Sequence, residues 1–345
     1  MTMPATEQRV VQTNTTDKPP ILEIEDLVVE FRQGSKVVRA ANHVSLTVRH
    51  GETVGIVGES GSGKSVLCRS ILRLLPSPPS FVRSGRIKFA GRDLLSLPEE
   101  EMKKIRGADI AMIFQNPMNA LNPVWPIGDQ ITEGERVHRD IGAGAARARA
   151  VALLKRVGIP SPEMRVEEYP HQWSGGMVQR AVIAMAIAEG PKLILADEPT
   201  TALDVTIQDQ ILALLMDLQE ATGTTLILVS HDMAVVAETC DRVAVMYAGR
   251  IMELASTAEV FARPLHPYSL GLLRSIPRID GKDQRLEPIP GQPPSLSDLP
   301  PGCPFMPRCS YASPACSTAE IVLREVEKDH FSACIKAEEI AGMAP

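Results

Sequence analysis

The chain has 345 residues, 44% of them hydrophobic and 23% charged, which is typical of a globular protein. Its formal net charge of −6 argues against a nucleic-acid-binding protein, because such proteins are usually basic. No apolar run approaches the roughly 20 residues that span a bilayer, so we expect any membrane role to come through partners. The length predicts one large domain with an appendage, or two domains.

The N-terminal part is predicted to be a tail followed by strands. Residues 1–20 are polar and lack the apolar core of a secretory signal, so we expect a disordered tail and a cytoplasmic protein. Residues 21–31 and 44–48 alternate apolar and polar side chains, as half-buried strands do. Residues 52–58 form a more continuous apolar run that ends in glycine, which favours a buried strand.

Helical and strand patterns then alternate. Residues 65–75 have apolar residues at helical spacing and stop at a group of prolines, 85–91 indicate an edge strand, and 118–173 are mostly helical. The following segments alternate regularly and are helix 177–190, strand 193–199, helix 206–221, strand 224–232, helix 234–240 and strand pair 242–253. Such alternation, with continuous apolar strands, predicts a parallel α/β core. From about Arg263 proline becomes frequent and the periodicity fades, so we expect a domain boundary there.

The first motif with a chemical meaning is GESGSGKS, Gly58 to Ser65, which matches the pattern G-x-x-x-x-G-K-[ST]. It lies between a predicted strand and a predicted helix, and this context argues against a chance match in a glycine-rich turn. Backbone N–H groups of such a loop wrap phosphates, Lys64 reaches the β- and γ-phosphates, and the Ser65 hydroxyl binds Mg²⁺. The residues expected to bind the nucleotide here are Gly58, Ser60, Gly61, Gly63, Lys64, Ser65 and Val66.

Two carboxylates end the apolar run LILADEP. Ionised carboxylates at the end of a buried strand are costly unless they meet a cation. Asp197 is therefore expected to hold Mg²⁺ through water, and Glu198 to orient and polarise an attacking water. The alternative, in which Glu198 only caps the following turn, leaves that residue without a chemical role.

A second candidate phosphate site lies in WSGGMVQR, Trp173 to Arg180. A Ser-Gly-Gly turn that opens a helix presents backbone N–H groups and a positive dipole end to an anion. One nucleotide does not need two such turns from one chain. The residues by themselves leave the purpose of the second turn open.

The motifs together resemble the ATP-binding-cassette ATPases. GESGSGKS, Gln115 after the apolar MIF, WSGGMVQR, LILADEP, TALD and LVSHD occur in the order typical of that family. The resemblance implies an α/β fold with a RecA-like P-loop core, an antiparallel β subdomain and an inserted helical subdomain. We expect a cassette over 21–262, with the helical subdomain at about 118–175, and a cysteine-containing extension over 263–345.

The resemblance also assigns roles to single residues. Two cassettes of this family dock head to tail, so Ser174, Gly175 and Gly176 would contact the γ-phosphate held by a partner's P-loop. Trp173 and Met177 depart from the usual Leu-Ser-Gly-Gly-Gln, although the Ser-Gly-Gly centre is intact. The remaining roles implied are Mg²⁺ and water sensing by Gln115, a dimer contact by Asp204, a γ-phosphate contact by His231 and adenine stacking by Phe31. Outside this family, a lone histidine at a strand end is usually only a surface residue.

Downstream segments are similar to the ATPase subunits of oligopeptide and dipeptide importers. These segments are QNPMNALNPVWPIGDQI, HPYSLGLLRSIP and IPGQPPSLSDLPPGCPFMPRC, and SILRLLPSPPSFVRSGRIKFAGRDLLSL resembles the first of the two paired ATPases. The resemblance implies a heterodimer with a sister ATPase, two permease subunits and an extracytoplasmic solute-binding protein, with this chain at the cytoplasmic face of the inner membrane. Nickel chelates, sugars or other small solutes remain alternative cargoes.

A soluble cassette protein without a transporter is a different class of function. Repair proteins of this kind need a very long coiled-coil insert between the P-loop and the Ser-Gly-Gly turn, and this chain has no room for one. Translation factors usually carry two cassettes in one chain, whereas this chain has one. Both observations favour the importer.

Four cysteines gather near the C-terminus in the spacing C-x5-C-x6-C-x17-C, as Cys303, Cys309, Cys316 and Cys334. Structural disulfides are not expected in a reducing cytoplasm. Free thiols, a structural Zn²⁺ site and a [4Fe–4S] cluster remain as alternatives, although the spacing lacks the tight pair of most zinc sites. Cluster-bearing peptide importers have a similar set, so the resemblance favours the cluster, with a structural role in a segment poor in large apolar residues.

Overall fold

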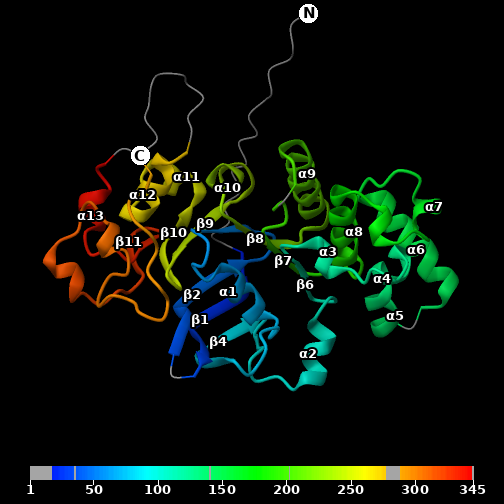
Figure 1. Cartoon of the computed structure of the whole chain (residues 1–345), viewed down its shortest axis with the longest axis horizontal. Helices are drawn as coiled ribbons and strands as arrows, with labels where there is room; N and C mark the ends of the chain where they lie inside the picture. Colours follow the sequence, from blue (N-terminus) through cyan, green and yellow to red (C-terminus); the bar gives the residue numbers. More distant parts are fainter. Residues whose placement is uncertain (1–17, 35, 140, 202, 277–287, 344–345) are drawn as a thin grey trace, which may run out of the picture.

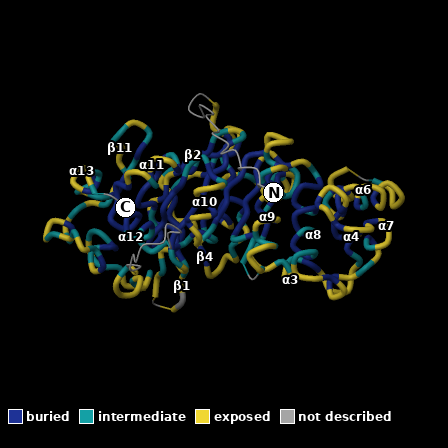
Figure 2. Tube along the Cα trace, turned by 90° about the horizontal axis from the view of Figure 1, so that it is seen from above, coloured by how far each residue is buried: buried dark blue, intermediate teal, exposed yellow. Residues whose placement is uncertain are grey.

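The computed structural model describes residues 18–34, 36–139, 141–201, 203–276 and 288–343. The expected N-terminal tail falls almost wholly outside the described residues. Figure 1 shows a central region of two sheets, a helical lobe on one side and the C-terminal extension on the other. Buried residues run through the middle of the molecule, and exposed residues gather toward its outside (Figure 2).

The smaller sheet is antiparallel and has the strand order β2-β1-β4-β5. Its strands are β1 (Pro20–Gln33), β2 (Lys36–Arg49), β4 (Ser80–Phe89) and β5 (Arg92–Asp93). Burial alternates along β2 because one face of the sheet covers the core. The strands are longer than the alternating runs predicted, since β-hairpin pairing carries them beyond the half-buried segments. Pro20 belongs to β1 and not to the expected tail.

The larger sheet has eight strands in the order β11-β12-β10-β9-β3-β8-β7-β6. The strands are β3 (Thr53–Val57), β6 (Ile110–Ile113), β7 (Leu193–Asp197), β8 (Thr225–Ser230), β9 (Arg242–Tyr247), β10 (Arg250–Ser256), β11 (Arg324–Glu327) and β12 (His330–Ser332). β6, β7, β8, β3 and β9 pair in parallel, which confirms the predicted parallel α/β core. The carboxyl ends of these strands therefore meet at one edge of the sheet.

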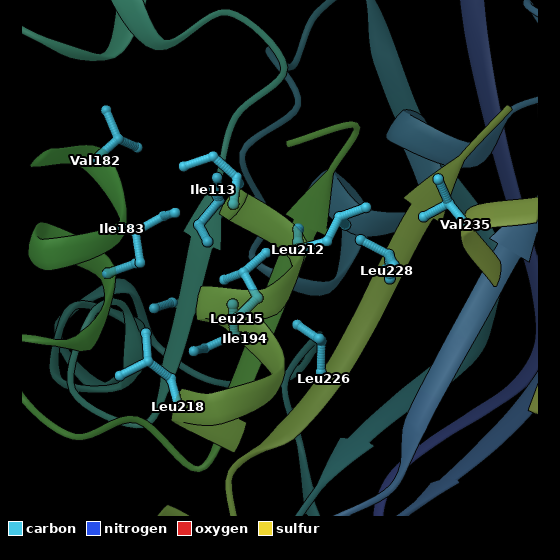
Figure 3. Close-up of a cluster of buried hydrophobic side chains, with 14 of the residues drawn as sticks. Ile113, Val182, Ile183, Ile194, Leu212, Leu215, Leu218, Leu226, Leu228 and Val235 are labelled. Carbon is cyan, nitrogen blue, oxygen red and sulfur yellow. The ribbon is translucent and has the colours of Figure 1, made fainter. Parts of the chain in front are cut away.

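Helices cover this sheet and bury its apolar residues. They are α1 (Lys64–Ile71), α2 (Glu99–Ile105), α9 (Val205–Thr222), α10 (Met233–Thr239) and α11 (Thr257–Ala262). In Figure 3, Leu212 and Leu215 of α9 lie against Ile194 and Leu226 of the sheet. Helix α1 ends earlier than the spacing over 65–75 predicts, because Arg73 takes a left-handed φ of 53° and turns the chain away.

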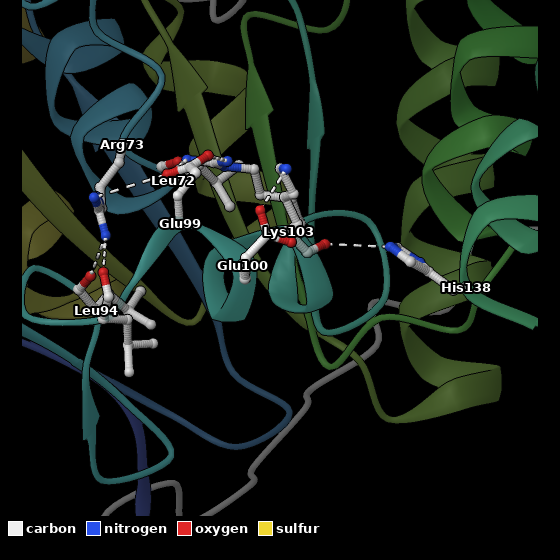
Figure 4. Close-up of polar contacts among 9 residues, drawn as sticks. Leu72, Arg73, Leu94, Glu99, Glu100, Lys103 and His138 are labelled. Carbon is white, nitrogen blue, oxygen red and sulfur yellow. Dashed lines mark hydrogen bonds and ion pairs between the residues drawn. The ribbon is translucent and has the colours of Figure 1, made fainter.

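The helical lobe is inserted between β6 and β7. It contains α3 (Pro117–Ala120), α4 (Ile127–Ile131), α5 (Glu133–Arg139), α6 (Ala143–Arg156), α7 (Pro162–Arg165), the 3-10 turn η2 (Pro170–Gln172) and α8 (Gly175–Ile187). His138 of α5 joins the lobe to α2, since its Nε2 lies 3.2 Å from the Lys103 carbonyl oxygen (Figure 4). Its Nδ1 lies 2.8 Å from the Glu189 carboxylate, at the end of the lobe.

The C-terminal extension has more regular structure than its weak periodicity predicts. It contains α12 (Pro267–Arg274), η3 (Met306–Arg308), η4 (Pro314–Ser317), β11, β12 and α13 (Ala337–Ile340). β12 pairs with β10, so the extension lengthens the core sheet. None of the helices in the described part of the chain is long and apolar enough to cross a membrane.

Candidate nucleotide-binding site

The phosphate-binding loop connects β3 to α1. Gly58, Gly61 and Gly63 have φ values of 152°, 78° and 104°, which side chains rarely adopt. A Cβ on Gly63, the N-cap of α1, would lie 2.1 Å from the backbone oxygen of Ala40 in β2. No side chain caps α1, so its first N–H groups are left for an anion. The loop is therefore shaped to bring backbone N–H groups against phosphates.

Lys64 lies folded into this loop. Its Nζ donates hydrogen bonds to the carbonyl oxygens of Gly58 at 2.6 Å and Glu59 at 3.0 Å. Burial lowers the pKa of Lys64, while the nearby carboxylates of Glu198 and Asp197 oppose this change. A buried ammonium next to N–H groups is a favourable place for the negative charge of a triphosphate.

Asp197 and Ser65 meet at the end of β7. The Ser65 Oγ donates to Asp197 Oδ1 at 2.7 Å, and Asp197 is completely buried. Its second oxygen, Oδ2, has no hydrogen-bond partner among the described residues, and burial raises the pKa of Asp197. A buried carboxylate oxygen without a partner, beside a hydroxyl, is a donor set that suits Mg²⁺. These residues thus fit the predicted ion.

Glu198 contacts side chains that follow neighbouring strands of the sheet. Its Oε2 accepts hydrogen bonds from Gln115 Nε2 and from Thr201 Oγ1, both at 2.9 Å, and lies 3.5 Å from His231 Nδ1. Gln115, Glu198 and His231 follow β6, β7 and β8. Glu198 itself has a left-handed φ of 47°, and its N–H donates to the Val229 carbonyl oxygen. Gln115 contacts Glu198 here and makes no direct contact with Ser65 or Asp197 among the described interactions.

Thr201 is a residue of this site that sequence reasoning missed. It lies three positions after Glu198, in the turn that follows β7. The sequence did contain a signal for it, namely a residue with a hydroxyl group shortly after the two acidic residues Asp197 and Glu198. A threonine in a turn is common, however, and the pattern did not single it out.

The Ser-Gly-Gly turn opens α8 in the helical lobe. Ser174 is the N-cap, and its Oγ accepts from Met177 N–H. Ser174 and Gly175 are exposed, and a Cβ on Gly176 would lie 3.0 Å from the Ile207 side chain of α9. Trp173, which departs from the family pattern, is buried and donates from Nε1 to Glu168 at 2.7 Å. Figure 1 shows α8 apart from α1, so the chain does not bring the turn to its own phosphate-binding loop.

Asp204 and Phe31 have no described contact with the phosphate-binding loop. Asp204 is the exposed N-cap of α9, and its Oδ1 accepts from Ile207 N–H at 2.9 Å. Phe31 is half-buried in β1 and pairs with Val38 of β2. Because β2 passes the loop at Ala40, Phe31 is on the sheet that borders the site, and its contact with adenine stays a prediction.

The four C-terminal cysteines line one pocket together with His266 and Phe305. Burial raises the pKa of Cys303 and Cys309, and raises that of Cys334 to about 12, so these thiols are protonated near neutral pH. In the described ranges, no three or more His, Cys, Asp or Glu side chains lie close enough to hold one metal ion. The described residues thus form no metal site that would confirm the expected [4Fe–4S] cluster or the alternative Zn²⁺ ion.

Comparisons with known proteins agree with this geometry. The ABC transporter family matches residues 41–201, and the family described as oligopeptide/dipeptide transporter, C-terminal region, matches residues 252–316. A peptide import ATP-binding protein of Brucella melitensis is 50% identical over 335 residues, which cover 94% of this chain and 99% of that protein. The oligopeptide transport ATP-binding protein OppD of Bacillus subtilis is 49% identical, over 90% of this chain and 87% of that protein.

Solved structures agree as well. A dimeric ATP-binding cassette in a post-hydrolysis state with ADP and phosphate has a TM-score of 0.62 and 28% identity, covering 68% of this chain and 98% of that chain. A component of an ABC transporter complex from Clostridium perfringens has a TM-score of 0.59 and 29% identity, covering 71% of this chain and 91% of that chain. The fold and the loop thus define an ABC ATPase cassette. Within that class, the chain belongs to the family of peptide import ATP-binding proteins.

Proposed function

We propose that this chain hydrolyses ATP to power the import of dipeptides or oligopeptides across the cytoplasmic membrane. The observation that carries the proposal is the convergence on Glu198 of Gln115, Thr201 and His231, beside the Ser65–Asp197 pair. Peptide import appears in the names of relatives that are about half identical over nearly the whole chain. Related importers for nickel chelates or other small solutes are the alternative.

Each residue of the site has a distinct part in the proposed reaction. The loop N–H groups and Lys64 bind the β- and γ-phosphates, and the partner-free Asp197 oxygen with the Ser65 hydroxyl holds Mg²⁺. Glu198 orients the attacking water and accepts its proton, while Gln115 and Thr201 hold the carboxylate in place. His231 contacts the γ-phosphate from the end of β8.

The Ser-Gly-Gly turn completes a partner's site. Ser174, Gly175 and the dimer contact Asp204 are exposed at the N-terminal ends of α8 and α9, where an anion is favoured. A solved relative of this fold is a dimer with ADP and phosphate. The proposed assembly is a heterodimer with a sister ATPase, two permease subunits and an extracytoplasmic solute-binding protein, attached at the inner face of the cell membrane.

We also propose that the four-cysteine pocket holds a [4Fe–4S] cluster. The four thiols line one pocket, and in the described ranges no group of three or more His, Cys, Asp or Glu side chains could hold a single metal ion. A cluster takes one thiolate at each of four irons and so spaces its ligands more widely than one ion does. The raised pKa values of Cys303, Cys309 and Cys334 mean that metal binding must displace the protons of these thiols. The cluster would then tie the extension together.

Replacement of Glu198 tests the proposed reaction. Glu198→Gln keeps the shape and the hydrogen bonds but cannot accept a proton, so we expect ATP binding to persist and turnover to fall about 10²-fold or more. Glu163→Gln, on the exposed surface of α7, is the matched control and should leave turnover unchanged. Unchanged turnover of Glu198→Gln in the purified complex would contradict the assigned role.

Iron and acid-labile sulfide assays test the cluster. In anaerobically purified chain we expect both elements, and we expect their loss in Cys303→Ser and Cys334→Ser. Cys240→Ser, at a buried thiol outside the pocket, should keep them. Zinc without sulfide, or no metal at all, would contradict the cluster and leave the ATP site as proposed.

A further inference from the structure

The phosphate-binding loop is held from outside by the C-terminal extension. Glu59, the residue after Gly58, donates from its backbone N–H to the hydroxyl of Tyr268 in α12 at 2.9 Å. Its carboxylate accepts two hydrogen bonds from Arg308 in η3, from Nη1 at 2.6 Å and from Nη2 at 2.9 Å. This paired geometry is the strongest form of an arginine–carboxylate contact. Both the backbone and the side chain of Glu59 are therefore fixed by the extension.

Arg308 has little freedom to move. It is 7% exposed, its Nε donates to the Pro290 carbonyl oxygen at 2.8 Å, and its Nη1 donates to the Tyr247 hydroxyl at 3.2 Å. Its guanidinium also lies over the rings of Tyr247 and Phe305. A buried guanidinium with so many contacts is rigid, and it would be destabilised without its carboxylate partner.

Glu59 connects Arg308 to the part of the loop that contains Ser62 and Lys64. Its carbonyl oxygen accepts a hydrogen bond from Lys64 Nζ at 3.0 Å and from Ser62 N–H at 3.2 Å. The residue that Arg308 holds is thus the residue against which Lys64 is placed. A change in Glu59 is expected to move the ammonium and the N–H groups that face the phosphates.

Arg308 also belongs to the four-cysteine segment, residues 303–334, which carries Cys303, Cys309, Cys316 and Cys334. It directly precedes Cys309, and the η3 turn that carries it is closed by hydrogen bonds from Arg308 N–H to Phe305 and from Cys309 N–H to Met306. Cys303 N–H in turn donates to the Cys316 carbonyl oxygen at 2.9 Å. The conformation of this segment therefore sets where the guanidinium lies.

We propose that Arg308 is a positioning residue for ATP binding, which acts through Glu59 and makes the ATP affinity depend on the folded state of the four-cysteine segment. The proposal rests on the proposed ATP site. It adds an influence on ATP affinity that comes from the C-terminal extension and not from the residues of that site. The loop binds phosphates with its own N–H groups and lysine, and the extension holds those groups in their binding positions.

Equilibrium ATP binding to the full-length chain tests this inference, with displacement of a fluorescent ATP analogue as the readout. We expect Arg308→Ala to raise the Kd for ATP about tenfold, because the loop must then be ordered by the nucleotide. Arg308→Lys keeps one charged contact and should lie between Arg308→Ala and the unchanged chain. Arg263→Ala is the matched control, since Arg263 pairs with Glu327 in the same extension and has no described contact with the loop or with the four cysteines, and its Kd should not change.

The amplitude of the titration separates positioning from folding. A purely structural role would reduce the fraction of chains that bind ATP and leave their Kd unchanged, and this result would overturn the inference. Glu59→Gln serves if Arg308→Ala does not fold, because it removes the charge with little change in shape. We expect it to raise the Kd about threefold, and no change would overturn the inference. Failure of the unchanged chain to bind ATP would instead contradict the proposed function.

A second pair of variants tests the link to the cysteines. Cys309→Ser should raise the Kd for ATP in the otherwise unchanged chain, because it replaces a thiol that lines the four-cysteine pocket by a hydroxyl, directly next to Arg308. In the Arg308→Ala background the same substitution should add little, since the contact is already lost. Equal effects in the two backgrounds, or no effect in either, would contradict the dependence on the four-cysteine segment.

Discussion

Two neighbouring carboxylates at the end of β7 make different contacts. Asp197 is buried, bonds the Ser65 hydroxyl and keeps one oxygen without a partner in the described chain, whereas Glu198 accepts bonds from Gln115 and Thr201. The backbone explains the difference, because the left-handed φ of Glu198 turns the chain directly after the strand. One carboxylate is thus suited to a cation and the other to a water molecule.

Thr201 provides the prediction at the scale of single residues. Thr201→Val removes one of the two hydrogen bonds to the Glu198 oxygen, and Gln115 still donates the other. We expect kcat for ATP hydrolysis to fall about tenfold, about 1.4 kcal/mol, with the KM for ATP little changed. Thr201→Ser keeps a hydroxyl and should recover most of the rate. A rise in KM without a fall in kcat would contradict a role in holding the carboxylate.

Sequence reasoning at this scale identified residues by type and position but not by contact. Lys64, Ser65, Asp197 and Glu198 follow from the glycine-rich loop and from charges at the end of an apolar strand. Thr201 and Arg308 did not follow, because a threonine in a turn and an arginine in a proline-rich segment have ordinary explanations. Their contacts exist only after the chain has folded, and Arg308 meets a residue 249 positions away.

At the scale of elements, we expect replacement by alanine to be more harmful at Gly63 of the phosphate-binding loop than at Gly61. Gly63→Ala would place a Cβ 2.1 Å from a backbone oxygen of β2, so the loop or the strand must move. Gly61→Ala meets nothing within 4 Å and suffers only from its φ of 78°. We expect Gly61→Ala to lose about 1 kcal/mol of unfolding free energy, and Gly63→Ala to lose more and to bind ATP at least about tenfold more weakly.

Urea unfolding and ATP titration measure these two effects. Gly91→Ala is a control outside the site, because Gly91 has a φ of 79° and also meets nothing within 4 Å. Its unfolding free energy should fall as much as that of Gly61→Ala. Equal ATP affinities of Gly63→Ala and the unchanged chain would show that the close approach to β2 does not shape the loop.

The Ser-Gly-Gly turn gives a second prediction at this scale. Ser174→Arg places a bulky cation at an exposed helix N-terminus, so it should lower turnover at the partner's phosphate-binding loop more than ATP binding at this chain's own loop. Met164→Arg adds the same charge at another exposed position of the helical lobe and should have little effect. ATP crosslinking to each subunit distinguishes the two sites. An equal loss of ATP binding at this chain's own loop would argue against a contact across the dimer.

Strands that are continuously apolar were predicted well from the sequence, whereas very short strands and helices were not. The runs that became β3, β7 and β8 are mostly apolar and almost completely buried, as is typical of parallel strands covered on both faces. β11 and β12 have four and three residues and lie in a segment without periodicity, so only their pairing with β10 reveals them. Helix α12 was missed because its eight residues lie in a proline-rich region.

At the scale of the whole molecule, the C-terminal extension packs against the cassette and adds strands to its sheet. β12 extends the core sheet, and Tyr268 and Arg308 reach back to the phosphate-binding loop. The expected boundary near residue 263 therefore separates segments of different composition that pack together. In the described part of the chain, the residues proposed to bind ATP form one site, and the Ser-Gly-Gly turn proposed to complete a partner's site is exposed. The proposed activity therefore belongs to an assembly.

The central claim is best tested by ATPase activity of the whole complex. The complex would be isolated through this chain from its native membrane, joined with its solute-binding protein, and given a panel of short peptides and nickel chelates. We predict that peptides stimulate ATP hydrolysis, and that Glu198→Gln abolishes the stimulated rate while Glu163→Gln leaves it intact. Stimulation by a non-peptide solute alone would contradict the peptide importer, although the ATP site would stand.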